Sequence, residues 1–518
     1  MTARPRRLLL ALACFALGGA PLTVLSAAPP ALSYSIDLNR RADDLFHVSL
    51  SVSGLAREND VYQFASTAPG TYQVMNIGRY VKSFQAFDGR GRPIPVTQIS
   101  VNQWRLSDPA RVRTIRYTVT ETWDSPLDHP IYKMCGTSIE ADHVLINPHA
   151  VIGYPGGLQA APVRLRLAYP AAWMVGTALH RGADGVFVAD NYDQLVDSPI
   201  LLGRLTRARA MVTGVPIDLY AYSETGKIKA PQLLSAMDGM LNAAGKFLGR
   251  LPVDRYTFLY HFSDQSAGAW EHSFSSEYVL QEGEFTDSVG KRVTDIAAHE
   301  FFHIVTPLNI HSEIIEHFNF VTPVPSRHLW LYEGTTEWAA HTMQLRAGLK
   351  SPEDYLATLV TKMKIDRQHF DSTYSLRELS LTSYSDSGQA QYGNIYLRGA
   401  VTAALLDIRL LELSHGQRGL QDLIVELAHR YGKRRAFPDS TFVDTLVAMT
   451  HPELRDFFDR YVLESEHLPV KAYFAKLGIT LVEDQQGQPV RFELDPRPTD
   501  EQRLLRDAWL GRKPRGAT

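Results

Sequence analysis

The chain has 518 residues, of which 45% are hydrophobic, and its formal net charge is -3. A chain of this length is large for a single hydrophobic core, so it predicts two or three domains. The charge close to neutrality provides no electrostatic basis for binding nucleic acid. Length and composition are those of a multidomain protein without a nucleic-acid partner.

The amino terminus has the pattern of a signal peptide. Basic residues between Arg4 and Arg7 precede an apolar run over 8–17, and the small residues Ser26 and Ala28 provide a cleavage site. The apolar run is too short for a membrane span. We therefore predict a signal peptide over 1–28, export to the periplasm or out of the cell, and no stable membrane span after cleavage. An uncleaved anchor is the alternative.

The two cysteines limit the covalent cross-links that the chain can form. Cys14 lies in the predicted signal peptide, where lipid attachment is the less favoured alternative because Ala11 and Phe15 depart from the usual lipoprotein pattern. Cleavage at Ala28 would leave Cys135 as the only cysteine. We therefore expect no disulfide within the mature chain.

The periodicity of the chain changes near residue 205. Apolar and polar residues alternate over 32–38 and 46–52, which predicts an all-β domain over 29–205. Residues 206–350 are predicted to form a second domain, with a strand over 256–262. Helical periodicity dominates 351–480, with helices expected near 353–369, 393–413, 419–431 and 452–463. Residues 481–518 are predicted to be a loose tail.

His299, Glu300 and His303 form an HExxH motif. Two imidazoles four residues apart lie on one face of a helix and can bind one metal ion, while the carboxylate beside them is one water away. Apolar residues recur at helical spacing around the motif, and Pro307 marks the end of the helix. The motif favours a metal-dependent hydrolase. The alternative is a chance match in a core helix.

A zinc hydrolase needs a third protein ligand, and several carboxylates compete for that position. Asn309 occupies the place of the third histidine of the metzincins, which excludes that class. Glu333 lies on a second predicted helix. Glu313 and Glu316 lie in a Pro-rich stretch where solvated acids are usual, and Glu337 lies one turn beyond Glu333. The context favours Glu333, although spacing alone does not decide.

Two motifs taken together resemble a known family. HEFFH at 299–303, followed by LWLYEGTTEW at 329–338, resembles the glycyl aminopeptidase family of gluzincin metallopeptidases. In that family HExFH precedes a Trp-containing segment with Glu-Gly-x-Thr. Four further segments match in the family's order: PGTY at 69–72, NYDQLVDSP at 191–199, GAWEHSFSS at 268–276 and YLRGA at 396–400. The resemblance extends over about residues 32–480.

The resemblance implies a multidomain α+β fold: an N-terminal all-β domain, a thermolysin-like zincin catalytic domain over 206–350 and a C-terminal helical domain. It implies one Zn²⁺ bound by His299, His303 and Glu333, with Glu300 as general base and then general acid. The segment 304–307 departs from the family's Trp-Asn, which changes the pocket beside the metal. Only about 38 residues follow Thr480, so we expect the family's usual PDZ domain to be missing.

The resemblance also implies roles for residues around the metal. Tyr396 matches a tyrosine opposite the metal and is expected to donate a hydrogen bond to the oxyanion, with a core tyrosine as the alternative. Arg398 replaces the family's lysine and keeps its charge. Glu271 is expected to bind the substrate's ammonium, with a solvent-facing glutamate as the alternative. Gly268 and Trp270 are expected at substrate-binding positions, where Trp270 narrows the first side-chain pocket.

These residues predict a zinc aminopeptidase that hydrolyses the N-terminal bond of peptides and prefers Gly or Ala. One alternative is a zinc endopeptidase whose cleft stays open past Glu271. Another is a non-catalytic peptide-binding protein on the same fold, which the retention of the metal ligands, Glu300 and Tyr396 argues against. Peptides are the only partners predicted. The natural peptide, the oligomeric state and the purpose of the β domain do not follow from the sequence.

Overall fold

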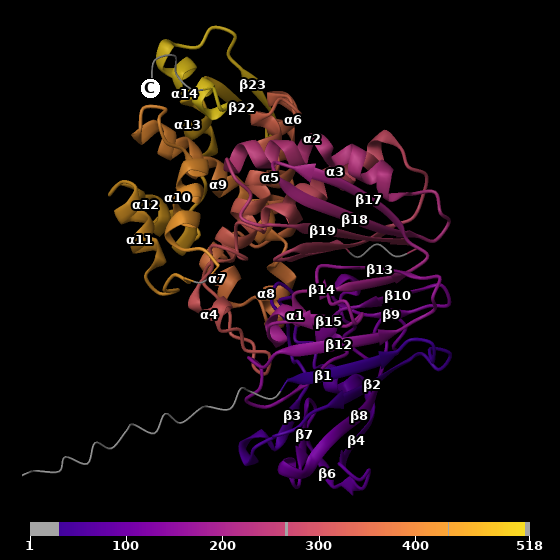
Figure 1. The fold of residues 1–518 in the computed structure, drawn as a ribbon. Coiled ribbons are helices and arrows are strands. Elements are labelled where there is room, and N and C mark those ends of the chain that lie inside the picture. The colour runs from indigo at the N-terminus through magenta and orange to yellow at the C-terminus, as the bar shows by residue number, and fades with distance from the viewer. Residues whose placement is uncertain (1–30, 265–267, 434, 513–518) are drawn as a thin grey trace, which may run out of the picture.

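The computed structural model describes residues 31–264, 268–433 and 435–512 (Figure 1). The predicted signal peptide, with Cys14, lies outside these residues. The described chain is a multidomain α+β protein in which a β-rich N-terminal region is followed by a mixed sheet and a helical region, so the predicted fold class is confirmed. Among the described residues, no helix combines the length and the apolar character that crossing a membrane requires.

The largest sheet of the N-terminal region has eight strands in the order β14-β15-β12-β1-β2-β8-β4-β5. Alternate residues of a strand face opposite sides, so Leu32, Tyr34 and Ile36 of β1 are buried in the core. The strands are β1 Leu32–Asp37, β2 Leu45–Ser51, β4 Val81–Asp88, β5 Pro93–Ile94, β8 Val112–Thr120, β12 Val163–Ala168, β14 His180–Arg181 and β15 Phe187–Ala189.

Two four-stranded sheets, a short helix and several 3₁₀ turns complete this region. One sheet consists of β13 Met174–Thr177, β16 Ile200–Gly203, β10 His143–Ile146 and β9 Ser138–Ile139, and the other of β11 Tyr154–Pro155, β3 Val61–Gln63, β7 Gln103–Leu106 and β6 Val96–Ser100. The helix is α1 Tyr192–Val196, and the turns are η1 Arg57–Asn59, η2 Ile77–Tyr80, η3 Pro109–Arg111, η4 Lys133–Cys135 and η5 Pro148–Ala150.

A five-stranded sheet lies between the β region and the helices (Figure 1). Its order is β17 Thr206–Val212, β18 Val215–Ser223, β19 Tyr256–Ser263, β21 Ser275–Gln281 and β20 Gly268–His272. The three central strands are parallel, and the edge strand β20 is antiparallel to β21. Helices α2 Ala230–Leu248 and α3 Asp287–Phe302 cover one face. On the other face Leu259 packs with Leu145 and Leu201 of the β region.

The helical region shares one hydrophobic core with the five-stranded sheet. This core contains Tyr72 and otherwise residues between Val212 and Trp509, on both sides of residue 350. The remaining helices are α4 Glu313–Glu316, η6 Trp330–Gly334, α5 Thr335–Arg346, α6 Pro352–His369, α7 Leu376–Leu381, α8 Asp386–Gln391, α9 Asn394–Leu413, α10 Leu420–Arg430, α11 Phe442–Met449, α12 Leu454–Phe458, η7 Asp459–Leu463 and α13 Val470–Ala475.

The prediction of a loose tail after residue 480 is wrong. Strands β22 Ile479–Glu483 and β23 Pro489–Leu494 form a hairpin, and helix α14 spans Asp500–Trp509. Trp509 is fully buried, its ring lies 5.5 Å from that of Tyr355, and its carbonyl accepts a hydrogen bond from Arg346 Nε at 3.1 Å. The Gln, Gly and Pro residues of this segment form the turns, while Leu505 and Trp509 give the helix one apolar face.

Candidate active site

A cavity of about 70 Å³ contains the residues of the HExxH motif. Larger cavities of about 480 to 530 Å³ lie elsewhere, and none of these is lined by a residue of that motif. The HExxH cavity is lined by Gly70, Thr71, Tyr132, Met134, Cys135, Ala269, Trp270, Glu271, His299, Glu300, His303, Glu333, Tyr392 and Tyr396. Among these described residues there is no lysine or arginine. The cavity is therefore suited to a cation.

Helix α3 brings the two histidines to the cavity. Its first turn is capped by Thr286, whose Oγ1 accepts a hydrogen bond from Val289 N at 3.3 Å. The buried residues Val293, Ala297 and Phe301 face the core, and the helix ends at Phe302 with His303 as its C-cap. The spacing of four therefore puts both imidazoles beside each other, with ring centroids 4.8 Å apart.

Glu333 reaches the same point from a π-helical turn, η6, which continues into α5. The next residue, Gly334, lies against Gly399 of α9, and a Cβ built on Gly334 would be only 2.8 Å from the Cα of Gly399. A side chain at either position would separate the two helices. The glycines of the Glu-Gly-x-Thr and Tyr-x-x-Gly segments thus allow Glu333 and Tyr396 to share one cavity.

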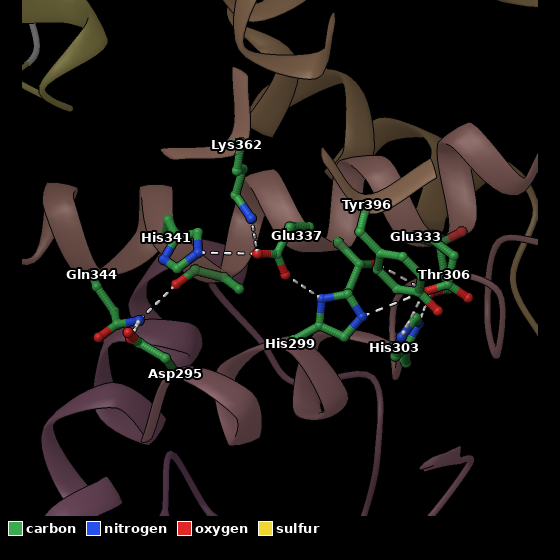
Figure 2. Close-up of polar contacts among 12 residues, drawn as sticks. Asp295, His299, His303, Thr306, Glu333, Glu337, His341, Gln344, Lys362 and Tyr396 are labelled. Carbon is green, nitrogen blue, oxygen red and sulfur yellow. Dashed lines mark hydrogen bonds and ion pairs between the residues drawn. The ribbon is translucent and has the colours of Figure 1, made fainter. Parts of the chain in front are cut away.

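The three predicted metal ligands converge (Figure 2). The Nε2 atoms of His299 and His303 lie 3.3 Å and 3.5 Å from the same oxygen, Glu333 Oε2. The other ring nitrogen, Nδ1, contacts an acceptor in each case. His299 Nδ1 lies 2.6 Å from Glu337 Oε2, and His303 Nδ1 lies 2.9 Å from the carbonyl oxygen of Thr306. Such acceptors hold a ligating imidazole with its other nitrogen free for the metal.

The chemistry of this donor set fits a cation. A carbonyl oxygen can only accept, so Nδ1 of His303 carries the proton, and burial lowers the pKa of His303 to about 4, which keeps the ring neutral. Its Nε2 lone pair consequently faces a carboxylate oxygen of Glu333. Two acceptors turned toward each other in a buried site repel unless a cation lies between them. His299, His303 and Glu333 could hold that cation.

Glu337 is the centre of a charged network behind His299 (Figure 2). Its carboxylate also accepts hydrogen bonds from His341 Nε2 at 3.1 Å and from Lys362 Nζ. Burial opposes its ionisation, but Lys362, His299 and His341 together hold the pKa of Glu337 well below its usual value. The sequence interpretation weighed Glu337 only as a competing ligand. Glu337 lies four residues after Glu333, and this spacing is the feature of the sequence that could have indicated a position near the same site.

Glu300, on α3, and Tyr396, on α9, both line the cavity. The Glu300 carboxylate has no hydrogen-bond or ion-pair partner among the described residues, and burial raises its pKa to about 8. A cation on the neighbouring ligands would lower that pKa. The Tyr396 ring lies 5.5 Å from that of His299, and burial raises the pKa of its hydroxyl well above the usual value. Tyr396 thus keeps the proton that a hydrogen-bond donor needs.

Glu271 lines the cavity together with residues of the β region, among them Gly70 and Cys135. It is 9% exposed, and burial, with Glu333 and Glu300 nearby, raises its pKa well above the usual value. Behind it is Gly70, at φ 77°, where an added Cβ would lie 2.5 Å from Glu271 Oε1. The PGTY segment therefore comes within contact distance of Glu271, and only a glycine fits there.

The other predicted positions have different surroundings. Trp270 lines the cavity, but its indole packs against His149 and His272 and donates a hydrogen bond to the Pro69 carbonyl at 3.1 Å. Gly268 begins β20 and is not among the described residues that line the cavity.

Arg398 also does not line the cavity; its guanidinium pairs with Asp366 at 2.8 Å and donates to the carbonyl of Tyr374 at 2.6 Å. It thus links α9 to α6. Glu313 and Glu316, on α4, do not line the cavity either, and Glu313 accepts a hydrogen bond from Asp439 N at 2.7 Å.

The NYDQLVDSP segment supports the strand that carries Glu271. Asp197 accepts a hydrogen bond from Ser273 N at 3.0 Å and lies 3.4 Å from His272 Nδ1. Both contacts are at the turn that joins β20 to β21. Asp197 thus holds the hairpin against the β region, a role that sequence reasoning did not assign.

Comparisons with known proteins identify the family to which the chain is similar. Residues 33–204 match a model of the peptidase M61 N-terminal domain, and residues 292–402 match a model of the M61 glycyl aminopeptidase. A crystal structure of an aminopeptidase N family protein from Idiomarina loihiensis is similar in fold, with a TM-score of 0.78 and 21% identity over 91% of this chain and 82% of that chain. A comparison with curated proteins finds no match.

The fold and the ligand cluster together define a peptidase of the HExxH-plus-Glu group. More particularly, the chain belongs to the M61 glycyl aminopeptidase family.

Proposed function

We propose that this peptidase is a zinc-dependent aminopeptidase that removes small N-terminal residues, Gly or Ala, from peptides. The observation that carries the proposal is the position of Glu271. Its buried carboxylate lies in the same cavity as His299, His303 and Glu333, and Gly70 is in contact range directly behind it. A peptide whose ammonium meets Glu271 has no room for a further residue on that side, so the bond presented to the metal ligands is the first one.

The residues have complementary roles in hydrolysis. Zn²⁺ bound by His299, His303 and Glu333 would supply a Lewis acid for the scissile carbonyl and for the attacking water. Glu300, whose carboxylate has no partner among the described residues, accepts the water's proton and then donates it to the leaving amine. Tyr396 donates a hydrogen bond to the carbonyl oxygen as negative charge develops on it.

The walls of the cavity support a preference for small side chains. Met134, Cys135 and Trp270 line the cavity with Glu271, and its volume of about 70 Å³ is well below the usual volume of a ligand site. A Gly or Ala side chain needs the least additional room. Leucine or phenylalanine would require these wall residues, of which Cys135 and Trp270 are buried, to move.

The proposal is tested by metal content and substrate range together. We expect about one zinc per chain in the purified protein, loss of peptide hydrolysis after treatment with a chelator, and recovery when zinc is restored. Gly- and Ala-terminated peptides should be cleaved faster than Leu- and Phe-terminated peptides. Full activity in metal-free protein would contradict the zinc assignment, and equal rates on all four peptides would contradict the size preference.

A further inference from the structure

A pair of tyrosine hydroxyls stands beside the metal-ligand cluster. Tyr392 OH lies 3.1 Å from Tyr396 OH, and both side chains line the cavity. Only Tyr396 contacts the ring of a ligand, His299. Tyr392 follows α8 directly and Tyr396 is in the first turn of α9, so the two rings are one helical turn apart. The Tyr392 hydroxyl is therefore within hydrogen-bond distance of the one tyrosine hydroxyl whose ring contacts His299.

The direction of this hydrogen bond matters because a hydroxyl has a single proton and can accept through its oxygen. If Tyr396 donated to Tyr392, its proton would point away from the substrate. If Tyr392 is the donor, the proton of Tyr396 is left for the carbonyl oxygen. Because the oxygen of Tyr396 is then occupied, its O–H bond is also restricted to fewer directions.

We propose that Tyr392 is a positioning residue that donates to the Tyr396 hydroxyl and thereby directs the Tyr396 proton at the substrate's carbonyl oxygen. The inference rests on the proposed peptidase reaction and adds a residue to it. Tyr392 does not touch the reacting atoms, so its effect on turnover depends on the hydroxyl of Tyr396. A residue that only stabilised the fold would affect turnover whether or not the Tyr396 hydroxyl is present, so this dependence distinguishes the two roles.

The β region holds Tyr392 in place. The ring of Tyr72, from the PGTY segment, lies 5.2 Å from that of Tyr392. The carbonyl of Tyr72 accepts a hydrogen bond from Gln389 Nε2 at 2.6 Å, and Gln389 Oε1 accepts one from Tyr132 OH at 2.9 Å. The β region and α8 are thus joined next to the hydroxyl pair. One purpose of the β region is then to fix Tyr392 and, through it, Tyr396.

The test is a double-mutant cycle on the zinc-loaded full chain, with an Ala-terminated peptide as substrate. We expect Tyr396→Phe to lower kcat by about 10²- to 10³-fold, the loss for one oxyanion donor. Tyr392→Phe should lower kcat by about tenfold, the worth of one net hydrogen bond, with KM nearly unchanged. In the double variant kcat should be no lower than in Tyr396→Phe alone, because a positioning residue has no effect once the hydroxyl that it positions is removed.

The matched control is Tyr117→Phe, which removes one hydroxyl from another buried tyrosine pair. Tyr62 OH lies 3.2 Å from Tyr117 OH in the β region, and neither residue lines the cavity. We expect this variant to keep its kcat, while the unfolding temperature and zinc content of each variant confirm that it is folded and loaded.

Unchanged kcat in Tyr392→Phe would overturn the inference, and so would losses that multiply in the double variant. Full activity of Tyr396→Phe would also overturn the inference about Tyr392. If that hydrolysis still depends on zinc, the proposed aminopeptidase function would not be affected. Absence of peptide hydrolysis by the zinc-loaded parent chain would instead refute the proposed function, and the inference with it.

Discussion

Glu300 is the residue at which metal binding and catalysis separate. Its carboxylate lies in the cavity outside the set of His299, His303 and Glu333, although its oxygen also lies within 4.8 Å of ligand atoms of Glu271 and His303. We predict that Glu300→Gln keeps its zinc and loses about 10²- to 10⁴-fold in kcat, because an amide fills the same space but accepts no proton from water. Zinc content and turnover are measured on one preparation. Near-parent turnover with zinc bound would remove Glu300 from the mechanism.

Glu333 and Glu337 are predicted to differ in their effect on zinc affinity. Glu333→Ala removes a ligand and should abolish tight binding. Glu337→Ala removes the acceptor of His299 Nδ1 and should weaken binding about 10- to 100-fold. From the sequence alone, Glu337→Ala would have been expected to leave zinc affinity unchanged, and the contact with His299 changes that expectation.

Competition with a coloured chelator measures the zinc affinity of these variants. Glu313→Ala is the control, because Glu313 lies on α4 outside the cavity lining. Parent-like affinity in Glu333→Ala would show that the third ligand is wrongly assigned. An affinity for Glu337→Ala equal to that of Glu313→Ala would show that the Glu337 contact does not orient His299.

At the scale of the elements, the contact between Gly334 and Gly399 decides whether the two halves of the site meet. A Cβ built on Gly399 would lie 2.9 Å from the Cα of Gly334, so the helices must separate to admit it. We predict that Gly399→Ala lowers the free energy of unfolding by about 1 to 3 kcal/mol, as overpacking does, and also lowers kcat.

Gly239→Ala is the control for this contact, because it also replaces a helical glycine. On α2 the new Cβ would meet only the end of the Leu349 side chain, at 3.3 Å. Alanine is the better helix former, so this variant should equal or exceed the parent in stability. Denaturant titration and steady-state kinetics distinguish the two variants. Equal stability of both would contradict a close helix contact at Gly399.

The elements also show which parts of the fold the sequence could predict. Strong periodicity located α6, α9 and α10 to within about two residues, and the HExxH helix ended before Pro307 as expected. The π-helical turn at Glu333 could not be predicted from the sequence. All five of its residues are buried, so the pattern of apolar and polar residues does not distinguish a π-helical turn from an α-helical one.

At the scale of the whole molecule, sequence reasoning failed where contacts join distant segments. The PGTY and NYDQLVDSP motifs were matched as family segments, but their roles behind Glu271 and Ser273 depend on how the β region packs against β20. Composition predicts a loose tail around Trp509 because it describes a segment in isolation. The burial of Trp509 against Tyr355 depends on a partner about 150 residues away.

The same packing distinguishes an exopeptidase from an endopeptidase. In the proposed function, Glu271 is the residue that would bind a free ammonium, and Gly70 of the β region lies in contact with its carboxylate. Glu271→Ala should therefore cost on the order of 2 to 5 kcal/mol in kcat/KM for peptides with a free amino terminus, with zinc content unchanged.

The most direct test compares kcat/KM for one Ala-terminated peptide with its amino terminus free and acetylated, in the parent chain and in Glu271→Ala. Acetylation removes the charge that Glu271 is proposed to bind and adds bulk near Gly70, which is in contact with Glu271. We predict rapid cleavage of the free peptide by the parent and no cleavage of the acetylated one. Equal rates on the two peptides would contradict the aminopeptidase assignment and leave a zinc endopeptidase as the better description.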